Sequence, residues 1–190
     1  MKPPMLEIVE WARLDEGQRR RVLGRPAQLN AAVTQEGVRE IVRKVRECGD
    51  DALLELTARF DRVRLESLEV GASELDAAAE TIPPADRAAL DTAMATVGRF
   101  HEAQRSAPVS IETAAGVLCE RIELPIDTVG LYVPAGSAPL PSTAIMLAVP
   151  ARTAGCRRRV LCTPPRPDGR ADPSVLYVAK ACGVHRIFKL

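Results

Sequence analysis

The sequence has 190 residues, a length that suits one substantial domain or a small domain with part of another. Hydrophobic residues make up 46% and charged residues 27%, which is typical of a globular protein. The formal net charge is only +1, with both signs mixed along the chain, and this argues against a nucleic-acid-binding arm or a basic membrane-binding patch. No apolar run in the sequence approaches the length of a membrane span.

The cysteines predict a reducing compartment. Their number is odd, none forms a Cys-x-x-Cys pair, and three lie among apolar residues, where a free thiol acts as a small hydrophobic group. The five are Cys48, Cys119, Cys156, Cys162 and Cys182. Because Glu7 and Glu10 interrupt the apolar residues near the N-terminus, we also expect no signal peptide. The pattern favours a cytoplasmic protein without a disulfide framework or a zinc knuckle.

The first part of the chain is predicted to be mostly helical. From Glu36 onward apolar residues recur at helical spacing, and Gly49 is expected to separate this helix from a second one that ends near residue 61. Further helices are expected from Ser73 and from Pro84, the last of them running to about residue 105.

A change of period after these helices predicts a β-hairpin. Residues alternate in polarity over 109–113 and again over 117–121, with Ala115-Gly116 as the turn between them. Pro125 is the best boundary in the sequence. We therefore expect a mostly helical segment ending in a hairpin over residues 1–125, and a second part over residues 126–190.

The second part is predicted to be the start of an α/β domain. Short apolar strands near residues 129–133, 160–163 and 185–190 alternate with helices that begin at Pro141 and Asp172. Continuous apolar strands are typical of parallel strands, whose connections are right-handed. The expected fold class is α/β, with the helical segment and hairpin followed by an incomplete Rossmann-like parallel βαβαβ unit, since a typical sheet has about five or six strands.

The strongest candidate site lies within residues 130–150. A strand, a tight turn and a helix that opens at Ser142 and Thr143 place free backbone N–H groups at the carboxyl end of a parallel strand, where open α/β sheets bind ligands. Gly136 would let a ligand approach the backbone closely, and Tyr132 offers a flat ring and a hydroxyl. The Gly-x-Gly-x-x-Gly fingerprint is absent, so this pattern alone leaves both phosphate binding and a purely structural turn open.

Several motifs resemble those of histidinol dehydrogenases. They are Gly-Leu-Tyr-Val-Pro-x-Gly-Ser-Ala-Pro-Leu from Gly130, Met-Leu-Ala-x-Pro-Ala from Met146, Ala-Gly-Cys from Ala154, Val-Leu-Cys-Thr-Pro-Pro from Val160, Leu-Tyr-x-Ala-x-x-Cys-Gly-Val from Leu176 and, earlier, Phe-His-Glu-Ala-Gln from Phe100. The similarity covers nearly the whole chain after about the first thirty residues. The chain resembles the N-terminal part of such an enzyme.

This resemblance implies zinc- and NAD-dependent oxidation of L-histidinol to L-histidine through L-histidinal, at the end of histidine biosynthesis, by a homodimer. The tyrosine of the family's motif contacts NAD, and the predicted cofactor-binding residues here are Tyr132, Gly136 and Ser137. The family's Glu-His base and zinc ligands lie further along a longer chain, so we expect no catalytic or metal-binding residue here and no activity from this chain alone. The family usually has glycine where Ala135 stands, and alanine would be strained there if φ is positive.

Two other interpretations remain open. The chain could be an inactive binding or assembly fragment that needs a separate C-terminal half, because an unfinished sheet leaves an apolar face and an edge exposed. It could also be an interrupted reading frame that folds poorly.

The two histidines do not favour a further site. His101 lies on an apolar helix face, His185 begins a strand, and neither has a carboxylate partner at catalytic spacing.

Overall fold

The computed structural model describes residues 8–24, 31–135 and 138–190. The chain divides into two compact units, Met1–Cys48 and Gly49–Leu190, and each is described here by itself. The second unit contains the predicted α/β part together with the hairpin and most of the helices that precede it. The domain boundary expected at Pro125 stays a prediction.

The first unit is helical where the structure describes it. It holds a 3₁₀ helix (Trp11–Arg13), α1 (Glu16–Leu23) and the first part of α3 (Ala31–Phe60). Helix α1 begins with a capping box, in which the Asp15 carboxylate accepts the Gln18 N–H at 2.8 Å and the Gln18 side chain accepts the Asp15 N–H at 2.9 Å. The apolar stripe predicted on α3 is solvent-exposed, with Val38 53% and Val42 41% exposed.

Gly49 interrupts α3, as the sequence predicts. Its φ of 57° and ψ of −134° lie outside the helical region, although the flanking residues are helical. A Cβ atom at this position would meet no atom within 4 Å. The backbone conformation, and not crowding, therefore requires glycine here.

The second unit contains a parallel sheet, a helical layer and a separate hairpin. Its elements are the end of α3, α4 (Ala72–Thr81), α5 (Pro84–Ala103), β1 (Val109–Ala114), β2 (Val117–Arg121), β3 (Thr128–Tyr132), α6 (Pro141–Thr153), β4 (Arg158–Thr163), α7 (Pro173–Ala181) and β5 (Arg186–Lys189). The predicted elements of this unit are thus present in the expected order. In the described part of the chain, no helix is both long enough and apolar enough to cross a bilayer.

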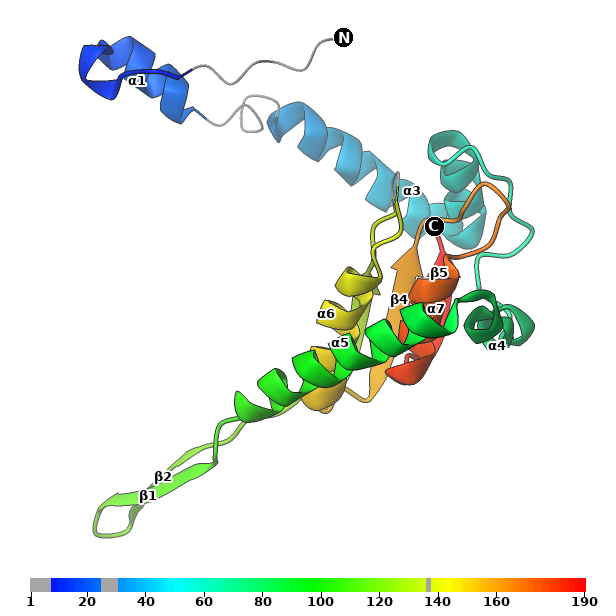
Figure 1. Cartoon of the computed structure of the whole chain (residues 1–190). Coiled ribbons are helices and arrows are strands. Elements are labelled where there is room, and N and C mark those ends of the chain that lie inside the picture. Colours follow the sequence, from blue (N-terminus) through cyan, green and yellow to red (C-terminus); the bar gives the residue numbers. More distant parts are fainter. Residues whose placement is uncertain (1–7, 25–30, 136–137) are drawn as a thin grey trace. The chain divides into compact units, whose positions relative to one another are not determined.

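Strand β4 lies between β3 and β5, and both neighbours run parallel to it. The register pairs Leu131 with Leu161 and Leu161 with Ile187, so these three buried side chains form one row across the sheet. Two successive crossovers in the same direction carry α6 and α7 to one face, as Figure 1 shows. The expected parallel βαβαβ unit is confirmed.

The core lies between this face of the sheet and the helices. Its helical side consists mainly of Ala144, Ile145, Ala148, Val149, Val175, Leu176, Val178 and Ala179. Helix α5 packs closely on this layer, because a Cβ atom on Gly98 would lie 3.7 Å from Val149 and because the Tyr177 hydroxyl donates to Asp91 at 2.8 Å. The low aromatic content thus gives a core of alanine and branched aliphatic residues.

The outer edge of β5 is covered, which the sequence did not predict. The segment before α4 pairs with it antiparallel: the Val70 N–H donates to the Ile187 carbonyl at 2.9 Å and the Lys189 N–H to the Leu68 carbonyl at 2.7 Å. The Arg186 guanidinium donates twice to Glu69, at 2.8 Å each, and this lowers the pKa of the Glu69 carboxyl. The open edge expected for an unfinished sheet is therefore absent on this described side.

The predicted β-hairpin is confirmed. Strands β1 and β2 pair antiparallel from Val109 opposite Arg121 to Ala114 opposite Val117. Gly116 takes a φ of 77° in the turn, a conformation that favours glycine. Every residue of both strands is exposed.

We predict that Leu161→Ala lowers the free energy of unfolding by about 2–5 kcal/mol, because Leu161 is fully buried and its truncation leaves a cavity. The same substitution at the exposed hairpin residue Leu118 should change it by less than about 0.5 kcal/mol. Denaturant unfolding followed by circular dichroism measures both. Equal effects of the two variants would contradict the central position of β4.

Candidate functional site

The sheet has a second face, opposite the helical layer, and Tyr132 lies on it. Side chains alternate along a strand, so the burial of Leu131 and Val133 in the core turns Tyr132 to the other side. Tyr132 is 56% exposed and is the last residue of β3. Its ring therefore lies at the carboxyl end of a parallel strand, where ligands bind to sheets of this kind.

The strand register shows which residues of the neighbouring strands lie beside Tyr132 on the same face of the sheet. Tyr132 pairs with Cys162, and Cys162 pairs with Phe188, at one level of three adjacent strands. Two residues earlier, Gly130 pairs with Val160, and a Cβ atom on Gly130 would meet nothing within 4 Å. Val160, Cys162 and Phe188 are half-buried. We call these five residues the open face; it is largely apolar, and the space above Gly130 is open.

The polar atoms of the open face suit binding and not nucleophilic attack. Burial raises the pKa of the Cys162 thiol, so this group stays protonated near neutral pH, whereas the thiolate is the reactive form. The Tyr132 hydroxyl has no hydrogen-bond partner in the described part of the chain. It is free to donate to a ligand or accept from one.

The N-terminus of α6 offers fewer donors than the sequence predicts. Its N-cap, Leu140, makes no side-chain hydrogen bond, and Pro141 has no N–H to offer. The N–H groups of Thr143 and Ala144 both donate to the Leu140 carbonyl, at 3.0 and 3.3 Å. Within the described residues, this leaves the Ser142 N–H as the free donor of the first turn. Only this N–H group could therefore bind an anion here.

Ala135, Gly136 and Ser137 are the remaining residues of the predicted loop. Among described non-glycine residues only Arg62 has a positive φ, so alanine at position 135 is not strained. Gly136 and Ser137 lie outside the described residues, and their part in cofactor binding stays a prediction.

The described residues contain no candidate metal site. Nowhere among them do three or more His, Cys, Asp or Glu side chains lie close enough together to hold a metal ion. His101 is half-buried, with its ring edge-on to Phe100 at a centroid distance of 5.8 Å. The His185 ring accepts the Arg159 N–H at 3.2 Å, a structural partner that the sequence did not predict.

Sequence reasoning singled out Tyr132 but not its neighbours Cys162 and Phe188. Both occur in predicted apolar strands, yet a strand pattern gives no register across a sheet. The alternation of side chains along each strand could have indicated which residues share a face of the sheet with Tyr132, once the three strands are aligned.

Comparison with known proteins places this fold and these motifs in a family. A family model described as histidinol dehydrogenase matches residues 24–190, which is most of the chain. The chain belongs to the histidinol dehydrogenase family. The resemblance expected from the motifs around Tyr132 is therefore confirmed.

Individual histidinol dehydrogenases match nearly the whole chain. One from Xanthomonas axonopodis pv. citri is 52% identical over 185 residues, which cover 97% of this chain and 43% of that protein. One from Vibrio parahaemolyticus is 46% identical, covering 97% of this chain and 42% of that protein. The crystal structure of histidinol dehydrogenase from Elizabethkingia anophelis matches with a TM-score of 0.78 and 37% identity, over 82% of this chain and 36% of that one. The chain thus spans less than half the length of the histidinol dehydrogenases it matches.

We predict that iodoacetamide modifies Cys162 more slowly than Cys119 at pH 8, because burial raises the pKa of the Cys162 thiol whereas Cys119 is exposed on the hairpin. Peptide mass spectrometry of the intact chain after timed labelling measures both rates, with the exposed Cys48 as a second reference. Modification of Cys162 at the rate of Cys119 would show an activated or fully accessible thiol on the open face, and would contradict this description.

Proposed function

We propose that this chain supplies the NAD-facing N-terminal part of a histidinol dehydrogenase, which oxidises L-histidinol to L-histidine through L-histidinal. The observation that carries the proposal is the exposed Tyr132 ring at the carboxyl end of β3, in a chain that belongs to this family. The zinc dependence and the homodimer implied by the motifs, and the cytoplasmic location inferred from the cysteines, are parts of the same proposal.

The residues of the open face fit a planar ring of the dinucleotide. Tyr132 presents a ring and a hydroxyl without a partner among described residues, and the space above Gly130, two residues earlier on the same face, is open. When bound, NAD accepts a hydride from the alcohol carbon of the substrate. Tyr132 would hold and orient a ring of the dinucleotide by stacking, a contact worth about 0.5–1.5 kcal/mol. The protonated Cys162 thiol would line the site without reacting.

The described residues do not fit a zinc site, so no step is derived through a metal from this part of the enzyme. They also bring no histidine together with a carboxylate at the open face as a general base. We therefore propose that this chain positions the cofactor, that proton transfer belongs to residues of the longer enzyme, and that the 190-residue chain alone does not oxidise histidinol.

The open face also supports a second candidate function, an assembly fragment that acts only with a separate C-terminal half. Half-buried Val160 and Phe188 beside an exposed tyrosine form an apolar surface that water does not favour. In this reading the open face is an interface between two chains. The two candidates differ in whether the face contacts NAD, which substitution of Tyr132 tests.

We predict that the 190-residue chain alone gives no NADH from histidinol and NAD, and that co-expression with the C-terminal remainder of the Xanthomonas axonopodis enzyme restores turnover. In the restored enzyme Tyr132→Leu should raise the KM for NAD by about tenfold, because loss of one stacking contact of about 1.4 kcal/mol corresponds to that factor. Steady-state kinetics with NAD and histidinol varied separately measure the effect.

The matched control is Tyr177→Phe. It alters the other tyrosine of the chain, whose hydroxyl donates to Asp91 and not to the open face. It should leave the KM for NAD unchanged. Turnover by the isolated chain would refute the proposal that proton transfer needs residues of the longer enzyme. An unchanged KM in Tyr132→Leu, with weaker association of the two halves, would favour the assembly function instead.

A further inference from the structure

A cavity of about 420 Å³ lies apart from the open face, between α4, the loop that follows β4 and the start of α7. Because this loop leaves the carboxyl end of β4, the cavity occupies the edge at which open α/β sheets bind ligands. Its lining includes Ser73, Glu74, Ala78, Arg166, Arg170 and Leu176. The proposed contact of Tyr132 with NAD does not involve any of these residues.

The loop holds two arginines opposite each other. The Gly169 N–H donates to the Arg166 carbonyl and the Arg166 N–H to the Arg170 carbonyl, both at 2.8 Å. Gly169 has a φ of 77°, so the loop is a three-residue hairpin turn closed by a glycine bulge. The hydrogen bond between the Arg166 and Arg170 backbones holds these two residues side by side where the turn begins and ends. Arg166 and Arg170 accordingly both line the cavity.

The turn is fixed in place before any ligand arrives. Its Asp168 carboxylate accepts the Arg170 N–H at 3.1 Å. A Cβ atom on Gly169 would lie 3.6 Å from Leu65 and 4.0 Å from Val63, so the turn rests on these apolar side chains. The position of both arginines at this end of the turn is therefore set by the backbone hydrogen bonds and the packing of the turn.

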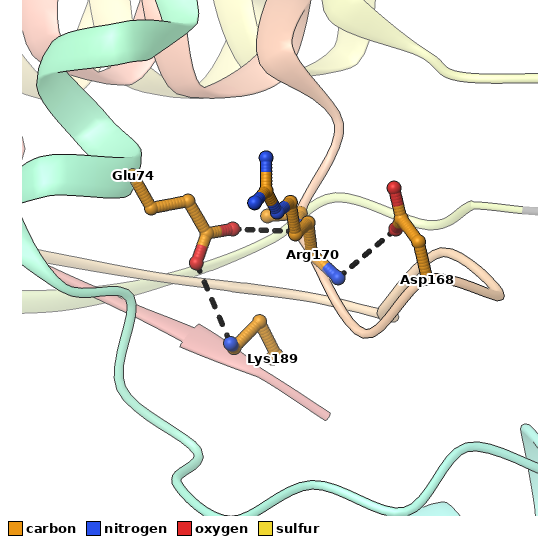
Figure 2. Close-up of polar contacts among 5 residues, drawn as sticks. Glu74, Asp168, Arg170 and Lys189 are labelled. Atoms are coloured by element: carbon orange, nitrogen blue, oxygen red, sulfur yellow. Dashed lines mark hydrogen bonds and ion pairs between the residues drawn. The ribbon is translucent and has the colours of Figure 1, made fainter.

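Neither guanidinium has a partner among the described residues. The nearby Glu74 carboxylate is occupied, because it accepts the Ala171 N–H at 2.8 Å and pairs with the Lys189 ammonium at 3.5 Å. Figure 2 shows the pair of Glu74 and Lys189. Lys189 is buried, so its charge balances that of Glu74. In the same view the Arg170 side chain points away from Lys189. Both arginines are exposed, so their guanidinium groups are available to a ligand that enters the cavity.

We propose that this cavity, the arginine-turn pocket, binds the phosphate group of a small phosphorylated ligand. A guanidinium is a planar fork that donates two parallel hydrogen bonds to a phosphate, and a dianion matches two such groups better than a monoanionic carboxylate does. The Ser73 hydroxyl at the rim adds a donor, and Ala78 and Leu176 offer an apolar floor for the rest of the ligand. The volume lies within the range of small-molecule sites. The inference holds whether or not the chain serves a dehydrogenase.

Isothermal titration of the 190-residue chain with pyrophosphate tests the proposal. Saturable binding is expected, and Arg166→Ala/Arg170→Ala should weaken it at least about tenfold, because hydrogen bonds between charged groups are among the strongest in proteins. The matched control is Arg157→Ala/Arg158→Ala, which also removes two arginine charges, but at the amino end of β4 and away from the cavity. It should leave the affinity unchanged.

Further titrations identify the source of the phosphate. ADP should compete with pyrophosphate, whereas succinate should not. Competition by NAD would assign the pocket to the dinucleotide diphosphate, and absence of competition to a separate phosphorylated ligand. No saturable pyrophosphate binding at low ionic strength would overturn the proposal, and so would equal weakening in the two double variants. Since no turnover is measured, these outcomes are independent of the dehydrogenase proposal.

Discussion

The structure of the second unit depends on the burial of one face of its sheet. Leu161, in the middle strand, is fully buried between Leu131 and Ile187, and the helices that cover this row come from crossovers in a single direction. Helices α4 and α5, which precede the sheet in the sequence, add to the same side. The helices thus cover one face of the sheet, and the alternation of side chains along β3 places Tyr132 on the other face.

The carboxyl edge of this sheet presents two surfaces of different chemistry. On the open face, Tyr132, Cys162 and Phe188 form a flat and largely apolar row. On the helical side, the turn after β4 directs Arg166 and Arg170 into a cavity. The same strand ends produce both, since each strand of a parallel sheet delivers its loop to this edge.

Much of this architecture could be predicted from the sequence, because its signals are local. Apolar runs bounded by proline and glycine marked β3, β4 and β5, and Gly49 marked the break in α3. Helix α1 was missed, although Asp15 and Gln18 form a recognisable capping box.

What the sequence did not reveal depends on contacts between distant segments. The pairing of Glu69 with Arg186, which closes the edge of β5, joins residues with no shared pattern. The register that aligns Cys162 with Tyr132 is likewise a property of the assembled sheet. The predicted N-terminal donors of α6 were over-counted, because Leu140 takes up two of them through its carbonyl and that geometry is invisible in the residue types.

The most direct test of this account is the solvent accessibility of the two sheet faces, measured by NMR relaxation enhancement from a soluble nitroxide on the 190-residue chain. The account expects strong broadening of the Tyr132 ring signals and protection of the Leu161 and Val133 methyl groups, because Tyr132 is 56% exposed and the other two side chains are fully buried. Equal protection of all three would show that Tyr132 is packed in the interior and would contradict the open face on which the proposed function rests.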